Sequence, residues 1–137
     1  MKKIDLSSWK RKEHFEFFSK MDSPIFGIVT EVDCDECYKN SKENGKSFFA
    51  SYLHKSMIAI NSVEELKYRI VDNEILAFEK IHAGITIARE DETFGFGFVN
   101  FSQDFETFNA ELNNEILEVK NCSGLRLNND DIKKDLI

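Results

Sequence analysis

The chain has 137 residues, of which 42% are hydrophobic and only one is proline, so it suits one compact domain over residues 1–137 and excludes a disordered protein. Its 18 basic and 25 acidic residues give a formal charge of −7, and positive charge gathers only at residues 10–12, so we expect no nucleic acid partner. The apolar runs are too short to cross a membrane, and residues 4–8 do not form a secretory signal, so we expect a cytoplasmic protein with no membrane partner.

The first predicted element is a helix over residues 9–19. Ser8 stands at the position of an N-cap residue, and Phe15 and Phe18 fall on one face of the helix that it would begin. Pro24 follows the polar residues after this helix and marks its end. A short amphipathic helix therefore opens the fold.

Residues 25–33 contain alternating β-branched residues and predict a strand. Asp33 then caps a polar helix that runs to residue 42 and is ended by Gly45 in a left-handed conformation. Cys34 and Cys37 form a C-x-x-C pair at the start of this helix, but no second pair follows and the acidic neighbours disfavour the thiolate. Three cysteines in all cannot pair completely, which fits a reducing compartment. We interpret the pair as two helix positions near the surface; a metal or redox site is the less favoured alternative.

A second and more apolar helix is predicted over residues 47–61. Its apolar residues recur at the spacing of one helical face, and further apolar residues flank that stripe. Such a wide face is typical of a helix that packs on a sheet. The stripe consists of Phe49, Leu53, Met57 and Ile60.

Four strands follow this helix. Residues 66–71 and 75–81 are apolar runs, and residues 72–74 have the composition of a tight hairpin connection between them. Residues 83–89 and 93–100 predict two further strands. Along the last strand the rings of one face alternate with glycines on the other, Phe94, Phe96 and Phe98 against Gly95 and Gly97.

The last predicted helix is capped by Ser102 and ends near Lys120. Its apolar residues recur at helical intervals, and the weakly patterned residues 128–137 predict no complete further element. Taken together, the elements predict an α/β protein, a two-layer sandwich in which helices pack on a mainly antiparallel sheet. The apolar positions of the last helix are Phe105, Phe108, Leu112 and Ile116.

The stretch Trp9-Lys10-Arg11-Lys12-Glu13-His14-Phe15-Glu16-Phe17-Phe18 resembles the N-terminal signature of the chloramphenicol acetyltransferase family. In that signature a tryptophan and one variable residue precede an Arg-basic-Glu run with a histidine and aromatic residues. Later segments are similar to the family in the same order, namely residues 28–33, 46–49, 65–70, 72–78 and the tripeptide Glu92-Thr93-Phe94. The likeness covers residues 1 to about 120, with Ala50 in place of a family proline and Ala88-Arg89 in place of a Phe-His pair.

This resemblance implies a coenzyme A-dependent acyltransferase fold. The family transfers an acetyl group from acetyl-coenzyme A to a hydroxyl of chloramphenicol or a similar small aromatic acceptor, an activity associated with antibiotic resistance. A histidine of its His-His-x-x-x-Asp-Gly segment removes the hydroxyl proton, and a serine of another late segment helps to stabilise the oxyanion. Both segments would follow Ile137, so we expect the chain to be either the N-terminal part of a longer enzyme or a truncated product, and to be inactive alone. The resemblance further implies a homotrimer and no metal.

The same resemblance suggests the site residues. Arg11 matches an arginine that pairs with the aspartate of the missing segment and clamps the active site; without that aspartate we expect Arg11 to be exposed or paired elsewhere. Phe18, Phe26 and Phe94 match positions that line the acceptor pocket, which the family assembles between trimer subunits, and ordinary core packing is the alternative for each. Position 18 is often tyrosine in the family, so a hydroxyl donor is lost here. We assign no catalytic role to the three histidines, His14, His54 and His82.

Two other functions stay open on the sequence. In the first, the chain is a catalytically incomplete binding module that holds an apolar ligand without turning it over. In the second, it is an interaction domain whose exposed apolar surface binds another chain that supplies the rest of the fold. A His-His-x-x-x-Asp-Gly segment after Ile137 would favour the enzyme over both.

Overall fold

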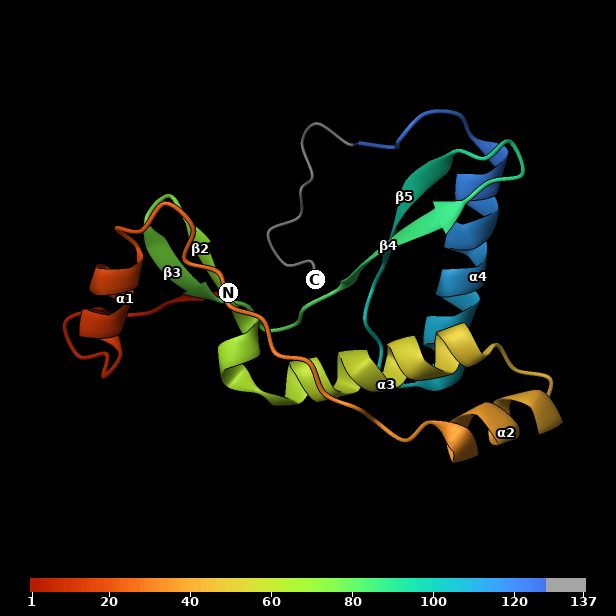
Figure 1. Cartoon of the computed structure of the whole chain (residues 1–137), viewed down its shortest axis with the longest axis horizontal. Helices are drawn as coiled ribbons and strands as arrows, with labels where there is room; N and C mark the ends of the chain where they lie inside the picture. Colours follow the sequence, from red (N-terminus) through yellow and green to blue (C-terminus); the bar gives the residue numbers. More distant parts are fainter. Residues whose placement is uncertain (128–137) are drawn as a thin grey trace.

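The computed structural model describes residues 1–127, so the prediction made for residues 128–137 lies outside the described residues. Figure 1 shows an elongated molecule with α1 and a small sheet at one end, α4 and a hairpin at the other, and α3 along the side between them. The helices are α1 (Lys12–Phe18), α2 (Asp35–Glu43), α3 (Phe48–Ser62) and α4 (Phe105–Asn121), with a 3₁₀ turn at Glu64–Lys67. The strands are β1 (Lys2–Lys3), β2 (Tyr68–Val71), β3 (Glu74–Ala77), β4 (Ala83–Ala88) and β5 (Phe94–Val99).

The strands form two antiparallel sheets. One has the order β1-β3-β2 and the other pairs β4 with β5. Asp72 and Asn73 join β2 to β3 with φ of 51° and 63°, the positive values that a two-residue type I′ hairpin turn requires. The α/β class and the antiparallel pairing are thus confirmed, while the described strands divide into two sheets where one was expected.

The core lies where α3 meets α4 and the β4–β5 sheet. Ser47 begins α3 by accepting a hydrogen bond from the Ala50 amide, at the start of the range predicted for this helix. The His54 ring is buried beside the Phe108 ring, with centroids 5.1 Å apart, and its Nε2 lies 2.9 Å from the Ser102 carbonyl oxygen. The fully buried side chains of this cluster include Ala50, Met57, Ile81, Val99, Phe108 and Leu112.

Helix α4 packs closely on β5 because the facing strand positions are glycines. A Cβ built on Gly95 would meet Nη2 of Arg89 and lie 2.9 Å from Cγ1 of Val119, and one built on Gly97 would lie 3.0 Å from Cγ of Glu115. Since strand side chains alternate, the phenylalanine rings lie on the opposite face, away from α4. The ring ladder predicted from the sequence is therefore present, but it does not pack under α4.

Three expected elements differ from the structure. Residues 25–33 form no strand but an extended, exposed segment without regular hydrogen bonds among residues 1–127. Helix α1 begins at Lys12 and not at residue 9, because the Ser8 hydroxyl bonds to Oδ2 of Asp5 at 3.0 Å and caps no helix. Asp104, not Ser102, caps α4 by accepting from the Thr107 amide. In the same described range, no helix is both long and apolar enough to cross a membrane.

Replacing Gly95 with alanine should lower the free energy of unfolding by about 1–3 kcal/mol, because the new methyl group forces apart α4 and β5. It would also displace the Arg89 guanidinium, which donates to the carbonyl oxygens of Val119, Phe94 and Gly124, each at 2.7 Å. Chemical denaturation of this variant, of a control variant and of the parent chain measures the change in the free energy of unfolding. Gly27→Ala is the matched control, since its Cβ would meet nothing within 4 Å, and should change stability by less than about 0.5 kcal/mol. Equal effects of the two substitutions would contradict the packing described.

The Asp104 cap should make stability depend on acid pH. Hydrogen bonds from the Thr107 hydroxyl and amide lower the pKa of Asp104 below its usual value. The carboxylate therefore stabilises the fold above its unfolded-state pKa of about 3.9 and loses this contribution as the pH falls through the lower folded-state pKa. Asp104→Asn keeps an acceptor that does not titrate. We expect the melting temperature of the parent chain to fall relative to this variant between pH 6 and pH 3; parallel curves would be the contrary result.

Candidate functional site

An apolar hollow of the described residues lies at α1, and we call it the N-terminal pocket. It measures about 270 Å³. The Trp9 ring supports one side, edge-on to Phe15 and to Tyr68 with centroids 6.3 and 6.4 Å apart. The pocket is lined by Trp9, Arg11, His14, Phe15, Phe18, Ser19, Pro24 and Ile70.

Arg11 bridges the pocket to the 3₁₀ turn that precedes β2. Its Nη2 donates to Oε1 of Glu65 at 2.8 Å, and both side chains are about half exposed. Beside this pair, the Tyr68 hydroxyl donates to Oε1 of Glu64 at 3.0 Å. Partial burial raises the pKa of Tyr68, and the Glu64 carboxylate adds to that rise. Arg11 is thus half exposed and paired with Glu65, as expected in the absence of the family aspartate, and its role as a clamp stays a prediction.

The three predicted pocket phenylalanines lie in different parts of the chain. Phe18 lines the N-terminal pocket and is 50% exposed. Phe26 lies in the extended segment after Pro24 and is 84% exposed. Phe94 begins β5, where its ring meets Phe96 edge-on at 5.6 Å, and Figure 1 places β5 at the opposite end of the molecule from α1. Within this chain the structure brings Phe18 together with Arg11 but not with the other two rings.

The histidines have distinct environments. His14 lines the N-terminal pocket. His54 is buried among the rings of Phe101, Phe105 and Phe108 in the core. His82 Nδ1 accepts a hydrogen bond from the Phe101 amide at 2.9 Å. His14 is therefore the histidine of this chain placed to touch a molecule in the N-terminal pocket.

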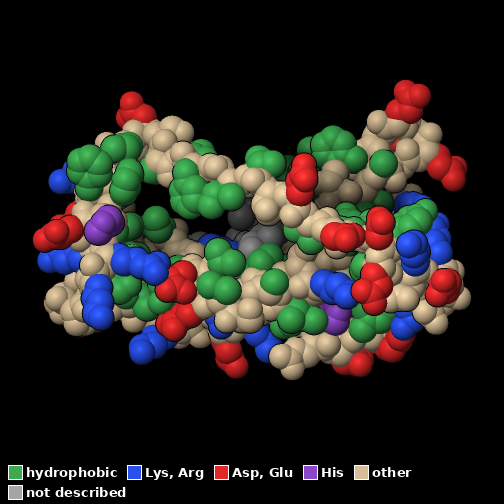
Figure 2. Space-filling view, turned by 60° about the horizontal axis from the view of Figure 1, so that its bottom comes forward, with side chains coloured by type: hydrophobic (Ala, Val, Ile, Leu, Met, Phe, Trp, Pro, Cys, Tyr) green, Lys and Arg blue, Asp and Glu red, His purple; other side chains and the backbone are tan. Residues whose placement is uncertain are grey.

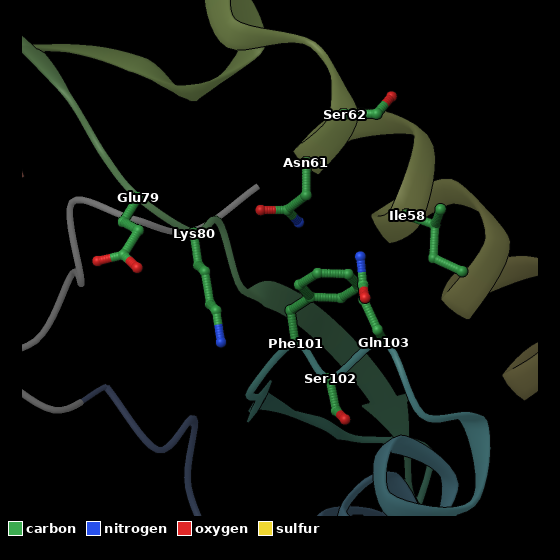
Figure 3. Close-up of a pocket in the computed structure, with 8 residues that line it drawn as sticks. All are labelled: Ile58, Asn61, Ser62, Glu79, Lys80, Phe101, Ser102 and Gln103. Atoms are coloured by element: carbon green, nitrogen blue, oxygen red, sulfur yellow. The ribbon is translucent and has the colours of Figure 1, made fainter.

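A second hollow of about 540 Å³ is more polar. Figure 3 shows that its walls come from the end of α3, the link at residues 79–81 and the link at residues 101–103. Asn61 ties two of these walls together, because its amide donates to the Ile81 carbonyl at 3.0 Å and accepts from the Ile81 amide at 2.8 Å. The lining residues are Ile58, Asn61, Ser62, Glu79, Lys80, Phe101, Ser102 and Gln103.

The sequence identified only part of the N-terminal pocket. Trp9 and Phe15 belong to the signature stretch, whose ring spacing on a helix predicts a shared face. Pro24 and Ile70 reach the pocket from outside α1, and no local pattern marks them. The three cysteines are free, and residues 1–127 hold no group of three His, Cys, Asp or Glu side chains that could hold a metal ion.

Comparison with known proteins shows the family to which this chain is similar. The family model described as chloramphenicol acetyltransferase matches residues 1–135. A chloramphenicol acetyltransferase of Proteus mirabilis is 28% identical over 77% of this chain and 49% of its own length, and chloramphenicol acetyltransferase 2 of Haemophilus influenzae is 23% identical over 90% and 58%. A solved chloramphenicol acetyltransferase structure superimposes with a TM-score of 0.85 at 29% identity, covering 94% of this chain and 62% of that one. The chain spans about half the length of the curated relatives it matches.

The Arg11–Glu65 pair should contribute little to the stability of this chain by itself. Both side chains are half exposed, so solvent screens their attraction and a coupling energy of about 0.2–1 kcal/mol is expected. A double-mutant cycle with Arg11→Ala and Glu65→Ala, read by chemical denaturation, measures that coupling. The exposed Lys3–Glu74 pair, at 2.5 Å, provides a matched cycle. A coupling above about 2 kcal/mol at Arg11 would mean that this pair already acts as a structural clamp.

Proposed function

Because this chain belongs to the chloramphenicol acetyltransferase family, we propose that it forms the acceptor-binding part of an O-acetyltransferase. That enzyme transfers the acetyl group of acetyl-coenzyme A to a hydroxyl of chloramphenicol or of a similar small acceptor, and it needs no metal. The observation that carries the proposal is the N-terminal pocket, to which the signature stretch contributes five of the eight lining residues. Its apolar rings suit a flat aromatic acceptor.

The acceptor lies against Phe18 in this proposal. The ring is half exposed beside an apolar hollow of about 270 Å³, which leaves its face available to an aromatic group. Phe94 joins the site through a second copy of the protein, because α1 with Phe18 and β5 with Phe94 lie at opposite ends of one chain. Phe26 follows Pro24, which lines the N-terminal pocket, and its exposed ring is the third aromatic contact of the acceptor. A homotrimer, the assembly that the sequence resemblance implies, supplies such a copy.

The chemistry is general base catalysis of acyl transfer. The base is a histidine from the second half of the enzyme, which follows the half that this chain matches in its relatives. This histidine removes the proton of the acceptor hydroxyl while the oxygen of that hydroxyl attacks the thioester carbonyl carbon. The tetrahedral intermediate then expels the coenzyme A thiolate, which takes up the proton, and the acetyl ester is released. In the enzyme, Arg11 pairs with the aspartate of that second half instead of with Glu65. This new ion pair holds the histidine segment against α1. The His14 side chain takes no proton in this scheme.

Binding without turnover is the second candidate. It is favoured by one observation, that residues of this chain form the N-terminal pocket by themselves. The chain would then hold an aromatic ligand and release it unchanged. Product analysis separates the two functions, because only the enzyme makes an acetyl ester.

A chimera that joins this chain to the second half of the Proteus mirabilis relative tests the enzyme. We expect chloramphenicol-dependent release of coenzyme A thiol from acetyl-coenzyme A, followed with a thiol reagent, and acetylchloramphenicol by mass spectrometry. Phe18→Ala should lower kcat/KM about tenfold, since a ring contact with the acceptor contributes about 1.4 kcal/mol. Tyr38→Ala, a half-exposed ring on α2, is the control and should leave kcat/KM unchanged. A chimera that folds but releases no thiol, or an unaffected Phe18→Ala variant, would overturn the acceptor site.

A further inference from the structure

The C-x-x-C pair of Cys34 and Cys37 lies at the first turn of α2. Cys34 is the residue that precedes the helix, and its carbonyl oxygen accepts a helical hydrogen bond from the Tyr38 amide at 2.8 Å. Cys37 follows three residues later, inside the helix. Residues three apart in a helix lie on the same side of it, with Cβ atoms about 5–6 Å apart. The fold thus places both thiols on one side of the same turn.

The Cys34 side chain is available to pair with Cys37. It makes no capping hydrogen bond, because Oδ1 of Asp33 accepts the hydrogen bond from the Asp35 amide at 2.9 Å instead. A disulfide requires Cβ atoms about 3.5–4.5 Å apart. Cys34 lies outside the regular helix, with φ of −114° and ψ of 3°, so a small rotation at this residue brings the two Cβ atoms within that range.

Cys37, in contrast, is held in place by α3. The Ser41 hydroxyl donates to the Cys37 carbonyl oxygen at 2.8 Å and lies 2.9 Å from the hydroxyl oxygen of Ser51 on α3. Ser41 is buried, so this contact belongs to the packing of α2 on α3. The Cys37 side chain is half-buried and lines a small hollow of about 320 Å³. One thiol is therefore fixed and partly covered, while the other is exposed and able to approach it.

The surface around Cys34 is charged and open. Cys34 and its neighbours Asp35 and Glu36 are all exposed. Figure 2 shows Asp, Glu, Lys and Arg side chains close to one another at the end of the molecule that carries α2 and α4. A small hydrophilic molecule therefore reaches the Cys34 thiol before it reaches the half-buried Cys37 thiol.

The third cysteine has no thiol beside it. Cys122 follows α4, where its thiol donates to the Val119 carbonyl oxygen at 3.5 Å and its sulfur accepts from Nη2 of Arg89 at 3.7 Å. Figure 1 shows the C-terminal end of α4 and helix α2 on opposite sides of α3. Cys122 is therefore a single thiol in the folded chain, and it provides an internal control for the pair.

We propose that Cys34 and Cys37 form a redox site, a dithiol that closes to a disulfide by exchange with a small-molecule disulfide such as oxidised glutathione. The structure favours this alternative over two unrelated surface positions, because it places an exposed thiol beside a fixed one on a single turn. The inference is separate from the acetyl transfer proposed above, since neither cysteine lines the N-terminal pocket.

The exchange proceeds in two steps. The Cys34 thiolate attacks one sulfur of the small disulfide, which forms a mixed disulfide and expels one small thiolate. The Cys37 thiolate then attacks the Cys34 sulfur, which forms the bond between the two cysteines and expels the second small thiolate. The protons of the two protein thiols pass to the expelled thiolates. The protein is thereby oxidised by two electrons, and the small disulfide is reduced to two thiols.

Equilibration with oxidised and reduced glutathione tests the site. The chain is incubated with both at a pH of about 8.5, where an ordinary thiol is half ionised, and the remaining thiols are then blocked with N-ethylmaleimide. Trypsin releases residues 21–39 as one peptide with both cysteines, because residues 22–38 contain no lysine or arginine. By mass spectrometry we expect the unlabelled internal disulfide of this peptide to exceed its glutathione adducts at least tenfold at about millimolar glutathione, because the second thiol is tethered beside the first.

Matched variants separate the pair from ordinary thiols. In Cys34→Ser the internal disulfide should be lost, and Cys37 should carry only glutathione or the blocking label. Cys122→Ser should leave the equilibrium constant of the internal disulfide unchanged. Equal melting temperatures of the reduced parent and both variants confirm that they fold.

The contribution of the fold is tested by repeating the equilibration in concentrated urea. Without the helix the two thiols are held together less closely, so we expect the equilibrium constant to be at least tenfold lower. Equal constants in the folded and the unfolded chain would overturn the proposal. Glutathione adducts at both cysteines of the folded chain, without an internal disulfide, would do so too. Disulfide-linked dimers that Cys34→Ser abolishes would show that Cys34 pairs with a second copy and not with Cys37.

Discussion

The close approach of α4 to β5 is the contact on which the rest of this structure depends. Gly95 and Gly97 remove the side chains that would hold the helix away. Arg89 fills the space above Gly95 and donates hydrogen bonds to backbone carbonyls, and Glu115 lies above Gly97. Because α4 occupies that face of the hairpin, the phenylalanine rings of β5 turn to the other. The same contact fixes α4 against α3, where His54 and Phe108 close the core. The end of the molecule that carries α4 and β5 is therefore closely packed, and the phenylalanine rings of β5 lie on the face away from α4.

Much of this arrangement was predictable, because its determinants are local. The helical stripe of α3, the Asp72-Asn73 turn and the ring and glycine alternation of β5 are each written in a few neighbouring residues. The strand expected at residues 25–33 failed for a different reason. Alternation reports what a segment is suited to form, while a strand also needs a partner, and residues 1–127 supply none. Two helix caps were misassigned because a second polar side chain lies near each candidate. The Ser8 hydroxyl bonds to Asp5 and caps no helix, and Asp104 caps α4 in place of Ser102.

The candidate site was predictable only in its α1 part. Arg11 and Phe18 belong to one short stretch, and the helix brings them to one pocket. Pro24 and Ile70 complete that pocket through tertiary structure, which no spacing in the sequence records. Phe26 and Phe94 lie apart from it, one on the unpaired segment and one on the ring face of β5. Both rings are exposed to solvent, so the predicted site residues of this chain lie on separate surfaces and do not line one closed cavity.

Hydrogen exchange of the backbone amides at residues 25–33 tests most directly whether this segment has no strand partner among residues 1–127. Amides that lack hydrogen bonds exchange at the rate of an unstructured peptide, whereas paired strand amides are protected. We predict unprotected exchange throughout this segment, and exchange slowed at least 100-fold at the paired amides of β4 and β5. Protection of residues 25–33 as strong as that of β4 and β5 would contradict this account, because it would mean that the segment is paired.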